Sequence, residues 1–129
     1  MHTDKTLLYI RRSKTACYVT PYDDLTLYRQ IDKLVNEGIT HYLFNADTNA
    51  GLRFARQVLL RKKKQKGNKA DNISLIAVTI DENAIADRNE LFRNEYFDIL
   101  SLCDEFIDIK GNSPDACEKF MLSKSGQII

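Results

Sequence analysis

The sequence predicts an α/β fold, a three-layer α/β/α sandwich around a mainly parallel sheet of about five strands. Short apolar runs typical of strands alternate along the chain with longer segments in which apolar residues recur every three or four positions. The run from Ile73 to Ile80 is almost entirely apolar and rich in β-branched residues, as expected for a strand buried on both faces of a parallel sheet. Alternation of this kind indicates βαβ units.

Composition supports one globular domain over residues 1–129. The length of 129 residues and a hydrophobic content of 43% are typical of a single folded unit and exclude a mainly disordered chain. No apolar run approaches the roughly 18 residues that a membrane span needs, so we expect no membrane insertion. The N-terminus lacks the pattern of a signal peptide, which favours a cytoplasmic location.

The strands are predicted from short apolar or β-branched runs. Ala16–Thr20 is either a strand or an extended loop, because Pro21 stops it early. The segments are Leu7–Ile10, Ala16–Thr20, Ile39–Ala46, Ile73–Ile80 and Glu105–Ile109, with Gln127–Ile129 resembling the opening of a last strand.

Four helices are predicted between these strands. Asp23 or Asp24 caps the first helix, and Gly38 ends it in the left-handed conformation that glycine allows. The third helix places Leu91, Phe92, Tyr96, Ile99 and Leu100 on one apolar face. The helices are expected from Asp23 or Asp24 to Asn36, from the turn at Asp47–Gly51 to Lys64, from about Arg88 to Cys103, and from Ser113 onward; Lys66–Asn72 is a polar loop.

Charge and cysteine content exclude several classes of function. The net charge of +1 does not favour nucleic acid as a partner. Residues 1–64 hold 12 Lys/Arg against 6 Asp/Glu, whereas residues 65–129 hold 7 against 12. The two halves would attract each other within one fold or between two copies as a homodimer; the alternative, which we favour, is that this distribution arises by chance. The three cysteines (Cys17, Cys103 and Cys117) and two histidines lack the spacings of a zinc site or a disulfide framework, and we expect reduced thiols and no bound metal or cofactor.

Fold logic predicts where a ligand would bind. In open α/β sheets, ligands lie beyond the carboxyl ends of the strands. The candidate residues are therefore Arg11 and Arg12 after the first predicted strand, the turn Asp47–Gly51 after the strand that ends at Ala46, and Asp81–Asn83 after the strand that ends at Ile80. On this prediction Arg11 lies near Gly51.

The turn Asp47–Gly51 offers polar groups to a ligand at the start of a helix. Thr48 and Asn49 supply hydroxyl, amide and backbone N–H groups, and Gly51 would allow a ligand to approach closely. Asp47 disfavours phosphate, since two like charges about 4 Å apart repel by roughly 4 kcal/mol at an effective dielectric constant of about 20. A ribose hydroxyl or a base edge is a better partner. The alternative is that Asp47 or Thr48 only caps the helix.

The remaining charged residues have structural alternatives. Arg11 and Arg12 would form a clamp for a phosphate or carboxylate, or one of them would pair with Asp81 or Glu82. The basic run Arg61–Lys64 is interpreted as a solvated face at a helix C-terminus. Nucleophilic catalysis is not supported, because His2 is terminal and His41 begins a predicted strand, at the wrong edge of the sheet for the site.

The back half of the chain resembles a known family. Residues 96–129 are similar to the corresponding stretch of YpsA-like proteins, which belong to the SLOG superfamily of Rossmann-like folds and are relatives of DprA and the LOG enzymes. The resemblance rests on Tyr96, Ile99, Leu100, Asp104, Ser113, Pro114, Phe120, Met121, Leu122 and Ser125. It implies a Rossmann-like domain that binds a nucleotide or nucleotide-derived ligand. The P-G-G-x-G-T motif of the LOG enzymes is absent, so the resemblance does not extend to their phosphoribohydrolase activity.

Three functional hypotheses follow. The first is a sensor or adaptor that binds a nucleotide-like ligand through Arg11, Arg12, Asp47, Thr48, Asn49, Gly51 and Asp81. The second is a hydrolase of N-glycosidic or phosphoester bonds, which would need a carboxylate from Asp47, Asp81 or Glu82. The third is an interaction module that has lost ligand binding. The absence of a placed catalytic base favours binding over catalysis.

Overall fold

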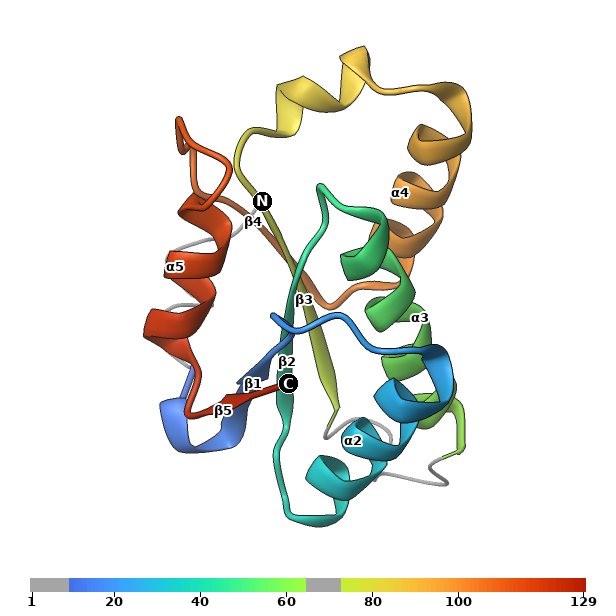
Figure 1. Ribbon diagram of the computed structural model, residues 1–129, viewed down its shortest axis with the longest axis vertical. Helices are drawn as coiled ribbons and strands as arrows, with labels where there is room; N and C mark the ends of the chain where they lie inside the picture. Colours follow the sequence, from blue (N-terminus) through green and yellow to red (C-terminus); the bar gives the residue numbers. More distant parts are fainter. Residues whose placement is uncertain (1–9, 65–72) are drawn as a thin grey trace.

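A computed structural model describes residues 10–64 and 73–129 and shows a five-stranded sheet in the order β4-β3-β2-β1-β5. Every neighbouring pair of strands is parallel. Three helices, α2, α3 and α4, cover one face of the sheet, and α5 covers the other (Figure 1). The predicted three-layer α/β/α fold with a parallel sheet is therefore confirmed, and its arrangement is Rossmann-like.

The elements alternate along the chain much as the sequence predicts. The strands are β1 (Thr15–Cys17), β2 (His41–Asn45), β3 (Ser74–Thr79), β4 (Glu105–Asp108) and β5 (Gln127–Ile128). The helices are α2 (Asp24–Asn36), α3 (Asn49–Lys64), α4 (Glu90–Leu102) and α5 (Ala116–Lys124), with two short 3-10 helices, η1 (Arg12–Lys14) and η3 (Glu82–Asp87). Because the strands are parallel, their carboxyl ends form one edge of the sheet, the carboxyl edge, and their amino ends form the amino edge.

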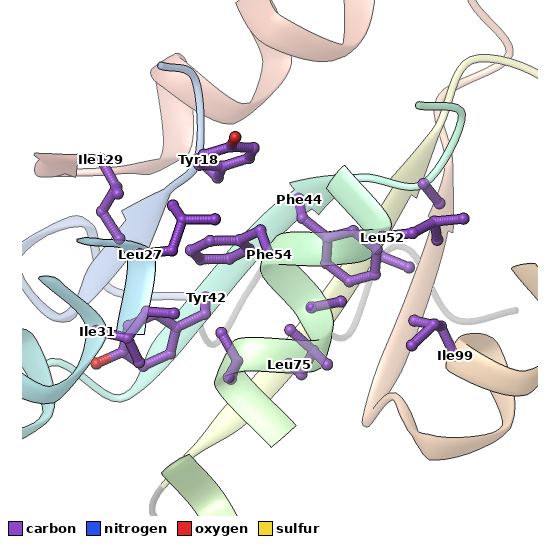
Figure 2. Packing of buried hydrophobic residues seen from close by; sticks show 14 of the residues in the cluster. Tyr18, Leu27, Ile31, Tyr42, Phe44, Leu52, Phe54, Leu75, Ile99 and Ile129 are labelled. Atoms are coloured by element: carbon purple, nitrogen blue, oxygen red, sulfur yellow. The ribbon is translucent and has the colours of Figure 1, made fainter. Parts of the chain in front are cut away.

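Alternate residues of the strands build two separate apolar layers. Tyr42 and Phe44 of β2 point toward α2, α3 and α4, whereas Leu43 between them packs on the side of α5. Figure 2 shows the larger layer, in which Phe54 of α3 lies among strand and helix side chains. Burial on both faces explains why the strand sequences are continuously apolar rather than alternating.

Local side-chain chemistry sets the ends of the helices. Asp23 caps α2 by accepting a hydrogen bond from the Thr26 N–H at 2.8 Å, and Asn89 caps α4 in the same way through the Phe92 N–H. Gly38 follows α2 with a φ of 89°, the left-handed conformation predicted for it.

Arg61 departs from the predicted solvated face. It is only 6% exposed, and its Nε donates to Asp32 of α2 at 2.6 Å. The reason is helical phase, since Arg61 follows the buried residues Phe54 and Val58 by seven and three positions. Its guanidinium therefore ties α3 to α2.

Leu91 also departs from its prediction, because it is 83% exposed although it was expected on the apolar face of α4. The reason is helical phase, since the buried residues of α4 are Phe92, Tyr96 and Ile99, and Leu91 lies about 100° around the helix from Phe92. The predicted strand Leu7–Ile10 lies outside the described residues except for Ile10, which belongs to no strand, and the predicted loop Lys66–Asn72 lies outside them as well.

Replacing Gly51 by alanine is expected to cost about 3 kcal/mol of unfolding free energy, since a Cβ there would lie 1.8 Å from the Asn45 carbonyl oxygen. Gly38→Ala is the matched control, because its Cβ meets nothing closer than 3.4 Å and the cost is only the positive φ, about 1 kcal/mol. Urea denaturation compares the two variants. A Gly51→Ala loss no larger than that of Gly38→Ala would contradict this packing.

Candidate functional site

A cleft of about 270 Å³ opens at the carboxyl edge, between the loop after β1, the turn after β2, and α5. We call it the carboxyl-edge cleft. Its position agrees with the general location of ligands in parallel α/β sheets. The residues that line it are Tyr18, Val19, Pro21, Asn45, Thr48, Ala50, Gly51, Glu118 and Met121.

Tyr18 forms a rigid aromatic wall of this cleft. Its ring stacks on Phe54 of α3, with ring centroids 4.8 Å apart and an angle of 6° between the planes. Its backbone N–H donates to the Leu43 carbonyl, which continues the pairing of β1 with β2. In Figure 2 the Tyr18 hydroxyl points away from the apolar cluster. Burial raises the pKa of Tyr18, so its hydroxyl stays protonated and can donate a hydrogen bond.

The turn after β2 is held by a compact set of local hydrogen bonds. The Thr48 hydroxyl accepts from the Gly51 N–H at 2.9 Å and donates to the Asn45 carbonyl at 3.3 Å. The Asn45 side-chain oxygen accepts from the Asp47 N–H at 2.9 Å, which leaves its amide group as a donor. Thr48 thus caps α3, in agreement with the alternative that Asp47 or Thr48 is a capping residue.

Gly51 has a different role from the one predicted. It is buried in the first turn of α3, and the missing side chain admits the Asn45 carbonyl rather than a ligand. The glycine therefore serves the packing of α3 against the end of β2. Thr48, Gly51 and Ala50 still line the carboxyl-edge cleft, so the predicted turn contributes to it as backbone and small side chains.

Asp47 does not line this cleft, because its carboxylate is bonded to the neighbouring strand. Oδ1 accepts from the Thr79 hydroxyl at 2.5 Å, and Oδ2 accepts from the Ile80 N–H at 2.9 Å. The Cys117 thiol of α5 lies 3.8 Å from the same Oδ2. The carboxylate thus joins the ends of β2 and β3 and faces α5, a role that the sequence alone did not indicate.

Arg11 and Arg12 lie at the opposite edge of the sheet from Gly51. Both precede β1, which begins only at Thr15, and Arg12 opens η1. The Arg12 carbonyl accepts a hydrogen bond from the Gly126 N–H, next to the start of β5. The prediction that Arg11 lies near Gly51 is therefore wrong: it assumed that the first strand ends before the arginines, whereas β1 follows them. A ligand in the carboxyl-edge cleft is not held by these two residues.

Asp81 and Asn49 lie at the carboxyl edge but outside the carboxyl-edge cleft. The exposed Asp81 caps η3 by accepting from the Asn83 N–H at 3.0 Å. The alternative prediction, that Arg11 or Arg12 pairs with Asp81 or Glu82, is also wrong, because both arginines lie at the amino edge. Asn49 is the first residue of α3 and lines a second pocket on the α4 side.

Sequence reasoning missed several lining residues as ligand contacts, namely Tyr18, Val19, Pro21, Asn45, Glu118 and Met121. Pro21 carried a usable signal, because a proline a few residues after a strand marks a loop at the carboxyl edge. Glu118 and Met121 are three positions apart and share a face of α5, but only the crossing of α5 over the sheet brings them to β1 and β2.

The structure offers little support for nucleophilic or metal chemistry. His41 begins β2 at the amino edge, as predicted, and burial lowers its pKa. Burial and the nearby Asp47 carboxylate raise the pKa of the Cys117 thiol to about 12, so the thiol is protonated and a poor nucleophile. Within residues 10–64 and 73–129, no cluster of three or more His, Cys, Asp or Glu side chains could hold a metal ion.

None of the helices described is both long enough and apolar enough to cross a membrane.

Asp47→Asn is expected to lower the unfolding free energy by about 1–3 kcal/mol, because asparagine replaces one of the two oxygens that accept from the Thr79 hydroxyl and the Ile80 N–H by an NH₂ group, which only donates. Asp81→Asn removes the same charge, but asparagine caps a helix as well as aspartate does, so its effect should stay below about 0.5 kcal/mol. Urea denaturation measures both variants. Equal losses would show that the Asp47 carboxylate does not join β2 to β3.

The raised pKa values of two thiols predict a loss of stability at alkaline pH. The folded protein raises the pKa of Cys103 and of Cys117 to about 12, whereas an unfolded thiol loses its proton near pH 8.5. The native state therefore binds more protons, and the unfolding free energy falls as pH rises above about 8.5, by about 2 kcal/mol per thiol at pH 10.

Urea midpoints at pH 7.5 and pH 10 measure this loss. Cys117→Ala should reduce the difference between the two pH values, while Ser123→Ala on the exposed side of α5 should leave it unchanged. A pH dependence that survives intact in Cys117→Ala would contradict the assignment.

No protein-family model matches this chain, and no curated protein matches it either. The fold is therefore assigned from the sheet order and the strand directions, and the candidate site is assigned from its geometry. The similarity to the SLOG superfamily stays a prediction.

Proposed function

We propose that the carboxyl-edge cleft binds a small nucleotide-derived ligand, with its nucleoside part inside the cleft, and that the protein acts as a sensor or adaptor. The observation that carries this proposal is the cleft itself, which lies beyond the carboxyl ends of β1 and β2 and has the fixed ring of Tyr18 as a wall. The Rossmann-like arrangement of the sheet agrees with the resemblance to SLOG proteins. Three free cysteines agree with a reducing compartment such as the cytoplasm.

The size and charge of the cleft favour a nucleoside over a larger or multiply charged ligand. A volume of about 270 Å³ lies just below the usual range for pockets that hold drug-sized molecules, so a dinucleotide would not be enclosed. Among the described residues that line it, Glu118 is the one charged side chain. The Glu118 carboxylate repels phosphate, because two like charges at close range disfavour each other.

The polar groups of the cleft suit the hydroxyls of a ribose and the edge of a base. The Glu118 carboxylate accepts hydrogen bonds and is well suited to ribose hydroxyls, which acidic residues bind in dinucleotide-binding folds. The Asn45 amide and the Tyr18 hydroxyl donate to acceptor atoms of a base. Met121 and Val19 supply the apolar surface that such a ligand buries.

A binding role is better supported than a hydrolytic one. The hydrolase hypothesis depended on a carboxylate from Asp47, Asp81 or Glu82. None of the three lines the carboxyl-edge cleft, and the Asp47 carboxylate is already bonded to Thr79 and Ile80.

Calorimetric titration with adenosine, guanosine and their 5′-monophosphates tests this proposal. We expect a nucleoside to bind at least about tenfold more tightly than its monophosphate, because Glu118 repels the phosphate. Glu118→Gln should narrow this preference, while Glu90→Gln, an exposed glutamate at the start of α4 that does not line the cleft, should leave it unchanged. Failure of all four compounds to bind at millimolar concentration would refute the proposal.

A further inference from the structure

We propose a second binding site, for a small oxyanion (a phosphate or a carboxylate), in the pocket between the first turns of α3 and α4. This pocket has a volume of about 340 Å³ and is lined by Asn49, Arg88, Asn89, Leu91, Phe92 and Glu95. We call it the Arg88 pocket. It is distinct from the carboxyl-edge cleft, since the two share no lining residue.

Arg88 is fixed in place by contacts within the protein. Its Nη1 donates to the Asp47 carbonyl at 2.7 Å, and its Cζ lies 3.7 Å from the centroid of the Phe92 ring. The Arg88 carbonyl in turn accepts from the guanidinium of Arg93. A guanidinium has five N–H donors, and the bond to Asp47 uses one of them. A cation held in this way loses little conformational entropy when it binds an anion.

The amide side chains around Arg88 add further donors. The Asn89 side-chain oxygen already accepts from the Phe92 N–H at 2.8 Å, so its NH₂ group is the part that remains for a ligand. Asn49 is exposed at the start of α3 and brings a second amide. Guanidinium and amide N–H groups converging on one pocket form the usual donor set for carboxylate and phosphate oxygens.

The acidic residue of this pocket does not cancel the charge of Arg88. Glu95 is the one carboxylate among the described lining residues, and its Oε2 accepts from Arg56 of α3, at 3.1 Å from Nη2 and 3.3 Å from Nε. The Arg56–Glu95 pair is therefore close to neutral, and Arg88 is the remaining charged side chain among the described residues that line the pocket. An anion is favoured there, in contrast to the carboxyl-edge cleft.

Titration of the ¹⁵N-labelled protein with inorganic phosphate, and separately with succinate, at constant ionic strength tests this site. We expect saturable shifts of the amides of Asn49, Arg88 and Phe92, with a dissociation constant of about 1–10 mM. Saturation by phosphate alone, by succinate alone or by both identifies the preferred oxyanion and supports the site in each case. The absence of saturable shifts at these residues with either anion up to about 50 mM overturns it.

Asn49→Asp is the decisive variant, because it places a carboxylate in the Arg88 pocket without touching the contacts that hold Arg88. Aspartate is also favourable in the first turn of a helix, so the variant should fold. We expect it to weaken anion binding at least tenfold, whereas Asn112→Asp, which adds the same charge on the exposed loop before α5, changes it less than about twofold. If both variants weaken anion binding equally, the effect comes from the net charge of the protein alone, and the proposed site is overturned.

Glu118→Gln separates this inference from the proposed function. It alters only the carboxyl-edge cleft and should leave phosphate affinity unchanged. Nucleoside binding and anion binding can therefore fail independently of each other.

Discussion

The first turn of α3 owes its position to the missing side chain of Gly51. The Asn45 carbonyl occupies the space that a Cβ would need, so the helix starts directly against the end of β2. Thr48 and Asn45 then close the turn with their own hydrogen bonds. Helix packing and these hydrogen bonds together hold the turn after β2 in one position, and with it the backbone and side chains that line the neighbouring pockets.

Both pockets of the carboxyl edge depend on this placement. Thr48, Ala50 and Gly51 face the carboxyl-edge cleft, while Asn49 faces the Arg88 pocket. The Asp47 carbonyl also receives the guanidinium of Arg88. One turn of backbone thus divides two recesses of opposite electrostatic character, one with a carboxylate at its rim and one with a fixed guanidinium.

Much of the fold was predictable because its signals are local. Each of these signals determines the structure of only a few neighbouring residues. The structure has a strand within the apolar run Ile73–Ile80, a capping residue at Asp23 and a left-handed glycine after α2, as the sequence predicts. Arg61 shows the limit of this reasoning. A basic run is typical of a solvated helix face, but the position of Arg61 around the helix directs its side chain toward Asp32 on another helix.

The candidate site was predictable only in part, for a related reason. The turn after β2 follows from the strand that precedes it, and it does line the carboxyl-edge cleft. The prediction for Arg11 and Arg12 was wrong because an apolar run lies on each side of them in the sequence. The run after them forms β1, so they lie at the amino edge and not at the carboxyl edge. Glu118 and Arg88 reach their pockets through long-range packing and hydrogen bonding, which no short stretch of sequence encodes.

The uniform direction of the strands also organises the charges of the whole molecule. Helices that return the chain between parallel strands all start at the same edge, and acidic residues occupy the first turns of α2, α4 and α5. Basic residues occupy the last turns of α2, α3 and α5, at the edge where Arg11 and Arg12 also lie. Each placement stabilises its own helix dipole. The acidic side chains at one edge and the basic side chains at the other therefore offset the partial charges of the helix ends, a stabilisation that weakens as the salt concentration rises.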